Sequence, residues 1–370
     1  MAVICTVTML GSVGATEAKK LRIQWSTDVD QRLPNAPMAL STPALLNHNN
    51  QTLIVLGGRD AWVHVYDLKG SEVRRFPLDA ASDSGALSLH NGLVVLGDIA
   101  GRLYGVDPVQ GKIVWRVQLS ASFTGTPVAI GQDFLVQTTD NRIYRFSPGG
   151  EKRWSFSGQN SALSLYLNPS PLVVGERIYV LLSNGDAIAL KAYSGDLLWK
   201  RQLLLSNEMS VLTDLKAPLA TPLFLPSLNI DGERAINALL MPFFQGDMIA
   251  LSAKDGGQNL SLPISLKSAP LVIGSMLYAA DSSGFLHAYN IKKGNRVWSK
   301  KISIHELLGP VSWKNQLWLT DNKGMVYHLN LNGEVQSKTN LKEHVSRLPV
   351  VTKAGLLVRT NRGSMYLVHP

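Results

Sequence analysis

The sequence contains almost no cysteine, because Cys5 is the only one among its 370 residues. A single cysteine excludes a disulfide framework and a cysteine-based zinc site within one chain. A lipid anchor on Cys5 would need a small residue just before it, and Ile4 stands there instead. We therefore expect neither a disulfide-bonded domain nor a lipidated cysteine.

Charged residues are also scarce, at 17% of the chain, yet no segment reaches transmembrane length without them. The 8 histidines show no spacing typical of metal ligands. No glycine-rich phosphate loop, nucleophile elbow or Ser-His-Asp set stands out. The sequence thus predicts no membrane-spanning helix, no metal, no cofactor and no catalytic residue.

The N-terminus has the composition of an export signal. Ala2–Ala15 is apolar, rich in small residues and suited to cleavage by signal peptidase after Ala15 or Ala18. It lacks the usual basic first residues, which favours a start slightly upstream; a buried or disordered N-terminal strand is the alternative. We expect residues 1–18 to be a signal peptide and residues 19–370 to form the folded protein.

Basic residues outnumber acidic ones, which gives a net charge of +9 and a pI of about 9.5. Such a surface could attract nucleic acid, anionic lipid headgroups or acidic partners. No run of Lys and Arg is interleaved with aromatic residues, and export removes nucleic acid as a partner. We interpret the charge as a solvated basic surface, with peripheral contact to an anionic membrane as the second interpretation.

Glycine and proline are plentiful, with 31 and 18 residues, and they punctuate a repeat. Its clearest copy has a strand before Asp107, a turn from Asp107 to Gly111, and a second strand that carries Trp115. Asp bonds its own backbone across such a turn, and Gly adopts a positive φ at little cost. Related strands carry Trp25, Trp154, Trp199 and Trp298.

The repeat has the period of a propeller blade. Gly246, Gly284, Gly324 and Gly363, each in the turn before such a unit, are 38 to 40 residues apart. Aligned positions in the following strand are mostly large, and their neighbours are often small, so we expect adjacent blades to nest. The large residues are His64, Tyr104, Tyr144, Ile188, Ile249, His287, Tyr327 and Tyr366; the small ones are Gly105, Ala189, Ala250 and Ala288.

The last repeat ends at Pro370 after its third strand, and Leu21–Val29 resembles the missing Trp-bearing strand. The sequence therefore predicts an all-β protein, an eight-bladed β-propeller of four-stranded antiparallel blades. The N-terminal strand closes the last blade and removes an open sheet edge.

Most residues that could suggest chemistry occupy structural positions of the repeat. His64 and His287 align with tyrosines, so we predict packing side chains with a bonded ring nitrogen rather than metal ligands. The five repeat tryptophans are expected to pack between blades rather than to stack on a quinone. Asp98, Asp140, Asp281 and Asp321 are expected to form turns rather than to act as acids or bases.

One connection, from Leu203 to Leu219, is more apolar than a solvated loop requires. It is either a small element packed on the rim or a docking loop for a partner. We predict a docking patch formed by this connection and by the loop between the third and fourth repeats. The predicted residues are Leu163, Leu165, Tyr166, Met209, Leu212, Asp214 and Leu215.

The Asp-x-x-x-Gly-x-x-x-Trp repeats of residues 21–370 resemble the quinoprotein (PQQ-type) propeller repeat. Within that superfamily the chain is most similar to the BamB family, the propeller subunits of the outer-membrane β-barrel assembly machine. The local match is Ala162-Leu163-Ser164-Leu165 and the long connection Leu204–Ala220. In that family the Leu-Ser-Leu loop and an acidic stretch dock the subunit BamA; here Tyr166 replaces an Arg, and the acidic pair is reduced to Asp214.

The resemblance implies a non-catalytic periplasmic scaffold, peripheral at the outer membrane, that docks a BamA-like subunit and could hold unfolded outer-membrane proteins. One alternative is a PQQ-dependent dehydrogenase-like quinoprotein. Enzymes of that family are longer and carry a vicinal disulfide and calcium-ligating acids, whereas this chain has one cysteine. A free periplasmic propeller that binds another ligand is the other alternative.

Overall fold

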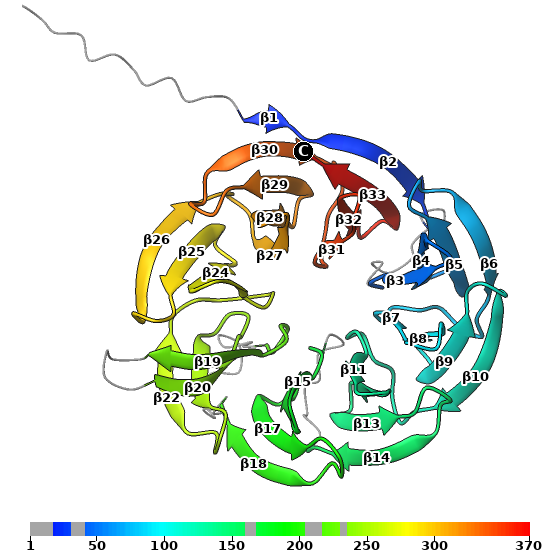
Figure 1. Cartoon of the computed structure of the whole chain (residues 1–370), viewed down its shortest axis with the longest axis horizontal. Helices are drawn as coiled ribbons and strands as arrows, with labels where there is room; N and C mark the ends of the chain where they lie inside the picture. The colour runs from blue at the N-terminus through cyan, green and yellow to red at the C-terminus, as the bar shows by residue number, and fades with distance from the viewer. Residues whose placement is uncertain (1–17, 31–40, 160–167, 204–216, 230–234) are drawn as a thin grey trace, which may run out of the picture.

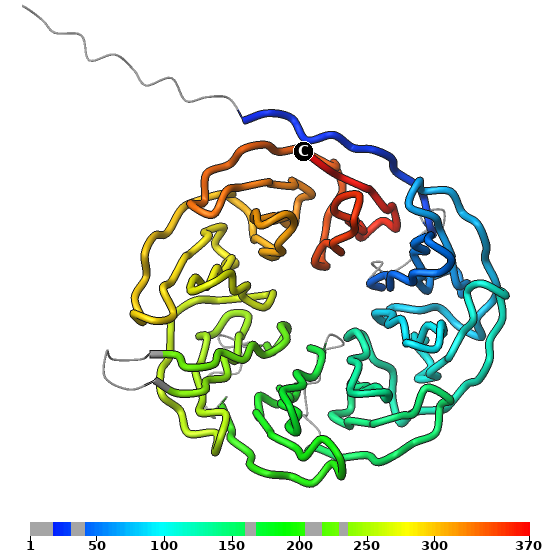
Figure 2. Tube along the Cα trace, viewed as in Figure 1, coloured from blue at the N-terminus to red at the C-terminus, as the bar shows by residue number. Residues whose placement is uncertain are grey.

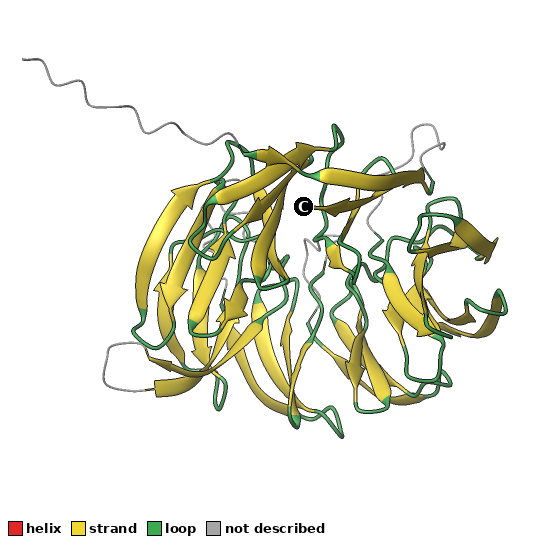
Figure 3. Ribbon diagram, turned by 45° about the horizontal axis from the view of Figure 1, so that its top comes forward, coloured by secondary structure: helices red, strands yellow, loops and turns green. Residues whose placement is uncertain are grey.

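The computed structural model describes residues 18–30, 41–159, 168–203, 217–229 and 235–370. This part of the chain folds into β-strands joined by turns and loops (Figure 3). In these residues no helix is long and apolar enough to cross a membrane.

The strands form eight sheets arranged as blades around a central axis, which confirms the predicted eight-bladed propeller (Figure 1). Blade 1 contains β3 (Ala44–His48), β4 (Gln51–Gly57), β5 (Trp62–Asp67) and β6 (Glu72–Pro77); blade 2 contains β7 (Leu87–Ser88), β8 (Val94–Gly97), β9 (Arg102–Asp107) and β10 (Lys112–Gln118); blade 3 contains β11 (Val128–Ile130), β12 (Asp133–Gln137), β13 (Arg142–Phe146) and β14 (Lys152–Ser157); blade 4 contains β15 (Leu172–Val174), β16 (Arg177–Leu181), β17 (Asp186–Lys191) and β18 (Leu197–Gln202).

The remaining blades follow around the ring. Blade 5 contains β19 (Leu223–Asn229), β20 (Ala235–Met241), β21 (Met248–Ser252) and β22 (Gln258–Leu262); blade 6 contains β23 (Leu271–Ile273), β24 (Met276–Ala280), β25 (Phe285–Asn290) and β26 (Asn295–Lys301); blade 7 contains β27 (Leu307–Trp313), β28 (Gln316–Asp321), β29 (Met325–Leu329) and β30 (Val335–Asn340); blade 8 contains β31 (Val350–Val351), β32 (Leu356–Arg359), β33 (Ser364–His369) and β2 (Arg22–Asp28). In each blade we call the strands a to d from the axis outward.

The N-terminal strand closes the ring as predicted. β2 is strand d of blade 8 and pairs antiparallel with the C-terminal strand β33, with Trp25 opposite Leu367. Figure 2 shows the N-terminal strand, in blue, beside the C-terminal strand, in red, at this blade. One feature was not predicted: β1 (Lys19–Lys20) adds a fifth strand to blade 7 by pairing in parallel with β30. The N-terminal segment therefore spans the junction between blades 7 and 8.

A buried ion cluster fixes the end of this closing strand. The Asp30 carboxylate lies 3.0 Å from an Arg359 nitrogen of β32 and accepts the backbone N–H of Arg59 at 2.7 Å. The Arg59 side chain also contacts Asp30 and donates to the carbonyl oxygen of Arg362. All three charged side chains are at most 5% exposed. A single carboxylate thus joins blade 8 to blade 1.

Tryptophans on strand d join neighbouring blades. The Trp115 ring of blade 2 covers Gly150 in the c–d turn of blade 3, and its Nε1 donates to the carbonyl oxygen of Pro148 at 3.0 Å. A Cβ atom on Gly150 would lie 2.7 Å from the ring, and its φ of +84° also requires glycine. The same contact joins Trp25 to Gly70, Trp154 to Gly195, Trp199 to Gly256 and Trp298 to Gly333.

The small residues of strand c have a more specific role than general nesting. Gly105 lies directly opposite Trp115 in the same blade, and a Cβ atom there would lie 2.1 Å from the indole. Ala189 and Ala288 lie opposite Trp199 and Trp298 in the same way. The small residue therefore makes room for the tryptophan of its own blade, which in turn covers the next blade.

Three of the eight junctions lack this tryptophan, among them the junction between blades 5 and 6. Leu260 of β22 occupies the equivalent position, opposite the small residue Ala250 and beside Gly294 of the next c–d turn. An apolar cavity of about 40 Å³ remains there, lined by leucines of both blades and by Tyr289. Both small residues of the contact are present, and only the large ring is missing.

The ion cluster makes a prediction about ring closure. Replacing Asp30 with Asn keeps the shape but leaves two buried arginines without their carboxylate, which typically costs about 3 kcal/mol or more. We expect a clear fall in the denaturant midpoint and in Tm. Asp196→Asn is the matched control, because the Asp196–Lys191 pair is exposed and its loss should change the stability far less. Equal stabilities of the two variants would show that the cluster does not hold the ring closed.

The incomplete junction predicts a stabilising substitution. Leu260→Trp should fill the cavity and place an indole between Ala250 and Gly294, raising the unfolding free energy by about 1 kcal/mol. Val297→Trp is the control, because Val297 is 52% exposed on the outer strand of blade 6 and faces no cavity. Chemical denaturation measures both variants. A Leu260→Trp protein less stable than the wild type would mean that the site cannot accept the ring.

Candidate functional site

The candidate site lies on one face of the propeller. Because the strands of a blade are antiparallel, its b–c turn lies at the same face as the connection from the preceding strand d into strand a. We call this the mouth face. It contains Thr42, Asn168, Ala220, Lys267 and Arg347, which precede strands a of five blades.

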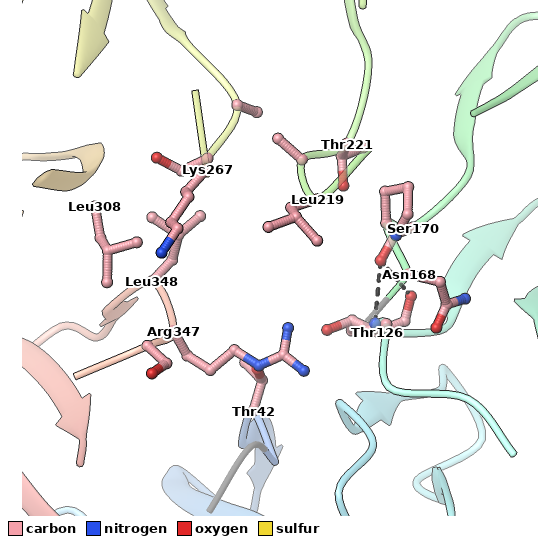
Figure 4. A pocket seen from close by; sticks show the side chains of 16 residues that line it. Thr42, Thr126, Asn168, Ser170, Leu219, Thr221, Lys267, Leu308, Arg347 and Leu348 are labelled. Carbon is pink, nitrogen blue, oxygen red and sulfur yellow. Dashed lines mark hydrogen bonds between the residues drawn. The ribbon is translucent and has the colours of Figure 1, made fainter. Parts of the chain in front are cut away.

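A cavity of about 180 Å³ lies at the axis on this face (Figure 4). Its lining comes from the starts of strands a in seven blades, so the fold itself forms it. The lining residues are Thr42, Gly125, Thr126, Asn168, Pro169, Ser170, Leu219, Ala220, Thr221, Lys267, Ser268, Ala269, Leu308, Ser346, Arg347 and Leu348.

Short polar side chains hold the rim of this cavity in place. The Ser170 hydroxyl accepts the Thr126 backbone N–H at 3.0 Å and donates to its carbonyl oxygen at 2.8 Å. Ser268 makes the same pair of bonds with Gly309, at 2.9 and 2.7 Å. Each hydroxyl thus bonds both the backbone N–H and the carbonyl oxygen of one residue in the adjacent blade. These bonds hold the lining residues of neighbouring blades in place.

Two cations project into the cavity from blades 6 and 8 (Figure 4). Arg347 donates to the carbonyl oxygen of Thr124 at 3.1 Å, across the axis from its own blade. Lys267 forms an ion pair with Glu306 at 2.7 Å, and its ammonium lies 4.4 Å from the centroid of the Phe244 ring.

Asp98, Asp281 and Asp321 accept backbone N–H groups of their own b–c turns, whereas Asp140 accepts the Thr138 hydroxyl. Asp98 accepts the backbone N–H groups of Ala100 and Arg102, both at 2.9 Å, and its other oxygen accepts the Tyr104 hydroxyl. Asp321 does the same for its own turn and for Tyr327. Burial, together with the Asp321 carboxylate, raises the pKa of Tyr327 to about 12, so this phenol stays protonated and donates.

The two aligned histidines are buried, and each has a bonded ring nitrogen. His64 is buried between Glu72, at 2.7 Å from Nδ1, and Asp60, at 3.1 Å from Nε2. Burial lowers its pKa, but the bonds to the two carboxylates outweigh burial and raise it above the usual value. His287 bonds Asp281 at 3.1 Å. In the described segments no three His, Cys, Asp or Glu side chains are grouped so as to hold a metal ion.

The predicted docking residues lie outside the described residues. Leu163, Leu165 and Tyr166 fall within 160–167, and Met209, Leu212, Asp214 and Leu215 fall within 204–216. Both segments lead in sequence into residues of the mouth face. Asn168 follows the first and bonds Thr124, and Ala217 follows the second and pairs with Phe244 through two backbone bonds.

Sequence reasoning missed the two cations of the cavity. In most repeats a proline precedes or begins strand a, and the residues just before that proline carried a signal for the two cations. Other copies carry small, hydroxylated or apolar residues there, as in Thr124-Gly125-Thr126-Pro127 and Leu219-Ala220-Thr221-Pro222. Lys267 and Arg347 interrupt that pattern, and alignment on the proline rather than on the later turn would have exposed both.

Comparison with known proteins identifies a family that this chain matches. The family model described as outer membrane protein assembly factor BamB matches residues 59–300 and 226–340. The BamB of Bordetella pertussis is 24% identical over 322 residues, which cover 85% of this chain and 76% of that protein. The BamB of Yersinia pestis is 22% identical over 291 residues, covering 76% and 70%.

Solved structures share the fold. The crystal structure of BamB from Moraxella catarrhalis superposes with a TM-score of 0.77 at 18% identity and covers 95% of this chain and 100% of that one. A quinohemoprotein alcohol dehydrogenase from Pseudomonas putida HK5 gives a TM-score of 0.72 at 12% identity, covering 94% and 72%. At such identities the likeness concerns the fold alone, whereas the family match spans well over half of the sequence. The chain belongs to the BamB family of outer membrane protein assembly factors.

Proposed function

We propose that this protein is a non-catalytic periplasmic scaffold, peripheral at the outer membrane, that serves the assembly of outer-membrane β-barrels. The family match over residues 59–340 carries the proposal. A closed propeller suits the role, because its repeated contacts make a rigid ring while its connections remain free to vary. In this role the chain would bind and orient partners without chemistry of its own.

The mouth face is the proposed docking surface. Exposed apolar side chains on this face are Ile99, Ile304 and Leu348, at 49%, 85% and 37% exposure. They stand on a b–c turn and on d–a connections, where no blade-to-blade contact requires them. Apolar residues of this kind surrounded by polar groups are typical of protein interfaces.

The proposed partner is a BamA-like subunit, with unfolded outer-membrane proteins as a second class. The connections 160–167 and 204–216 carry the apolar residues that we propose as anchors, Leu163, Leu165, Tyr166, Met209, Leu212 and Leu215, with Asp214 at their polar edge. Both lead into the mouth face, so the anchors and the exposed residues above would belong to one surface.

Docking predicts a loss of binding without a loss of stability. Replacing Leu165 or Leu212 with Asp should weaken binding of the BamA-like subunit by about 2 kcal/mol or more, as at interface hot spots. Affinity would be measured with the mature protein and its purified partner, after capture of that partner from envelope extract. Val114→Asp is the control, because Val114 is 48% exposed on the outer strand of blade 2.

Two other outcomes would contradict this docking surface. If both Leu variants lose Tm together with binding, the connections are elements packed on the rim. If binding and Tm both stay normal, the partner docks elsewhere on the propeller.

The quinoprotein alternative makes an opposite prediction. The five repeat tryptophans cover glycines between blades, so they are not free to stack on a quinone. We expect added PQQ and calcium to cause no shift in Tm and no dye reduction with alcohols or sugars. Saturable PQQ binding in the micromolar range, measured by fluorescence titration, would favour the dehydrogenase-like alternative.

A further inference from the structure

The outer strands of blades 6 and 7 gather basic side chains on the side wall of the ring, apart from the axial cavity. In Figure 1, β26, β30 and β1 follow one another along the outer circumference. These strands and the c–d turn of blade 6 carry eight cations, of which seven are exposed and one is half-buried. We call this set the basic wall; it consists of Lys19, Lys20, Lys292, Lys293, Arg296, Lys300, Lys301 and Lys338.

No acidic side chain balances the basic wall. Among the described residues, none of its eight cations forms an ion pair. Strands c and d of these two blades and the turns between them contain one acid, Glu334, which accepts from the Asn330 side chain at 2.7 Å. Lys301 donates to the Ser283 carbonyl oxygen and lies over the Phe285 ring, and neither contact neutralises its charge.

Packing of the blades does not account for this charge. On the outer strand of blade 4, by contrast, Lys200 lies 2.8 Å from the Asp186 carboxylate. In the basic wall, Lys20 of β1 is instead the direct partner of Lys338 of β30. Like charges at facing positions of two strands are destabilising. The added strand therefore brings positive charge to the wall at some cost in stability.

The composition of the basic wall favours a lipid surface over a protein partner. Seven of its eight cations are lysines, and protein interfaces are depleted in lysine and enriched in arginine. A lysine ammonium is a point charge without the fixed fork of a guanidinium, so it suits many loosely placed phosphates. Val297 stands among these cations at 52% exposure and can enter a headgroup layer.

We propose that the basic wall is the face with which this protein contacts an anionic phospholipid surface. Contact through the wall places the propeller axis along the membrane plane and leaves the mouth face open at the side for partners. The attraction needs no pocket, because charges act over about 10 Å at an ionic strength of about 0.1 M. The inference rests on the proposed peripheral location at the outer membrane and names the contact face.

The test measures how the mature protein sediments with vesicles of equal parts phosphatidylglycerol and phosphatidylcholine, and with vesicles of phosphatidylcholine alone. A triple variant of the wall, Lys20→Gln/Lys293→Gln/Lys338→Gln, should bind the anionic vesicles about tenfold more weakly or worse, since each lysine near such a surface contributes about fivefold. Raising NaCl from about 50 mM to about 500 mM should release the wild type, because the added salt screens these charges.

The matched control is the triple variant Lys69→Gln/Lys112→Gln/Lys152→Gln. It removes the same charge from exposed positions on blades 1, 2 and 3, and it should bind the anionic vesicles like the wild type. The Tm of both triple variants should equal that of the wild type, since each replaced side chain is exposed.

Three results would overturn the proposal: equal binding to the neutral vesicles, equal binding by the two triple variants, or no binding of the wild type to anionic vesicles. If a poly-glutamate chain binds through the basic wall and the vesicles do not, the partner is an acidic protein instead. Docking of the BamA-like subunit is measured without vesicles, so a failure of one proposal is distinguished from a failure of the other.

Discussion

Ring closure is the constraint on which the rest of this structure depends. A chain of eight similar blades would leave an open sheet edge where its two ends meet. The edge is removed when a strand from one end of the chain completes the blade formed by the other end. Here β2 completes blade 8, its Trp25 covers Gly70 of blade 1, and Asp30 adds a buried charge contact between the same blades. The contacts described between the other blades are mostly contacts between neighbours, so the closed ring depends on this junction.

Closure also separates two kinds of position along the repeat. Strands c and d are committed to the junctions, since five strands d carry a tryptophan that covers a glycine of the next blade, and three of these tryptophans lie opposite a small residue of strand c. The residues just before strand a take no part in a contact that recurs from blade to blade, as the tryptophan and glycine do. These residues are held by local hydrogen bonds, such as those of the Ser170 and Ser268 hydroxyls to backbone groups of an adjacent blade. Such bonds do not depend on which side chains line the axis beside them. Variation is therefore tolerated at the mouth face and costly at the outer junctions.

The fold could be predicted because one local signal recurs. The Asp-to-Gly turn and its tryptophan are short-range features, and repeated copies reinforce one another at a constant period. The closing strand was found because Trp25 lies in a copy without its first part. Two details carried no such signal: β1 is only 2 residues long, and the Asp30 cluster joins Asp30 to Arg359, 329 positions away. Long-range charge contacts cannot be read from one sequence.

The site was harder to predict than the fold for a related physical reason. A repeat reveals what all blades share, whereas a binding site on a symmetric ring must break that symmetry. Lys267 and Arg347 do so at two of the seven blades that line the cavity, and Leu260 does so at one junction. Reading the departures from the repeat, rather than the repeat itself, is what locates them. The net charge of +9 did not show which cations lie at the axis. The contact between Arg347 and the Thr124 carbonyl oxygen forms only when the closed ring brings the two residues together.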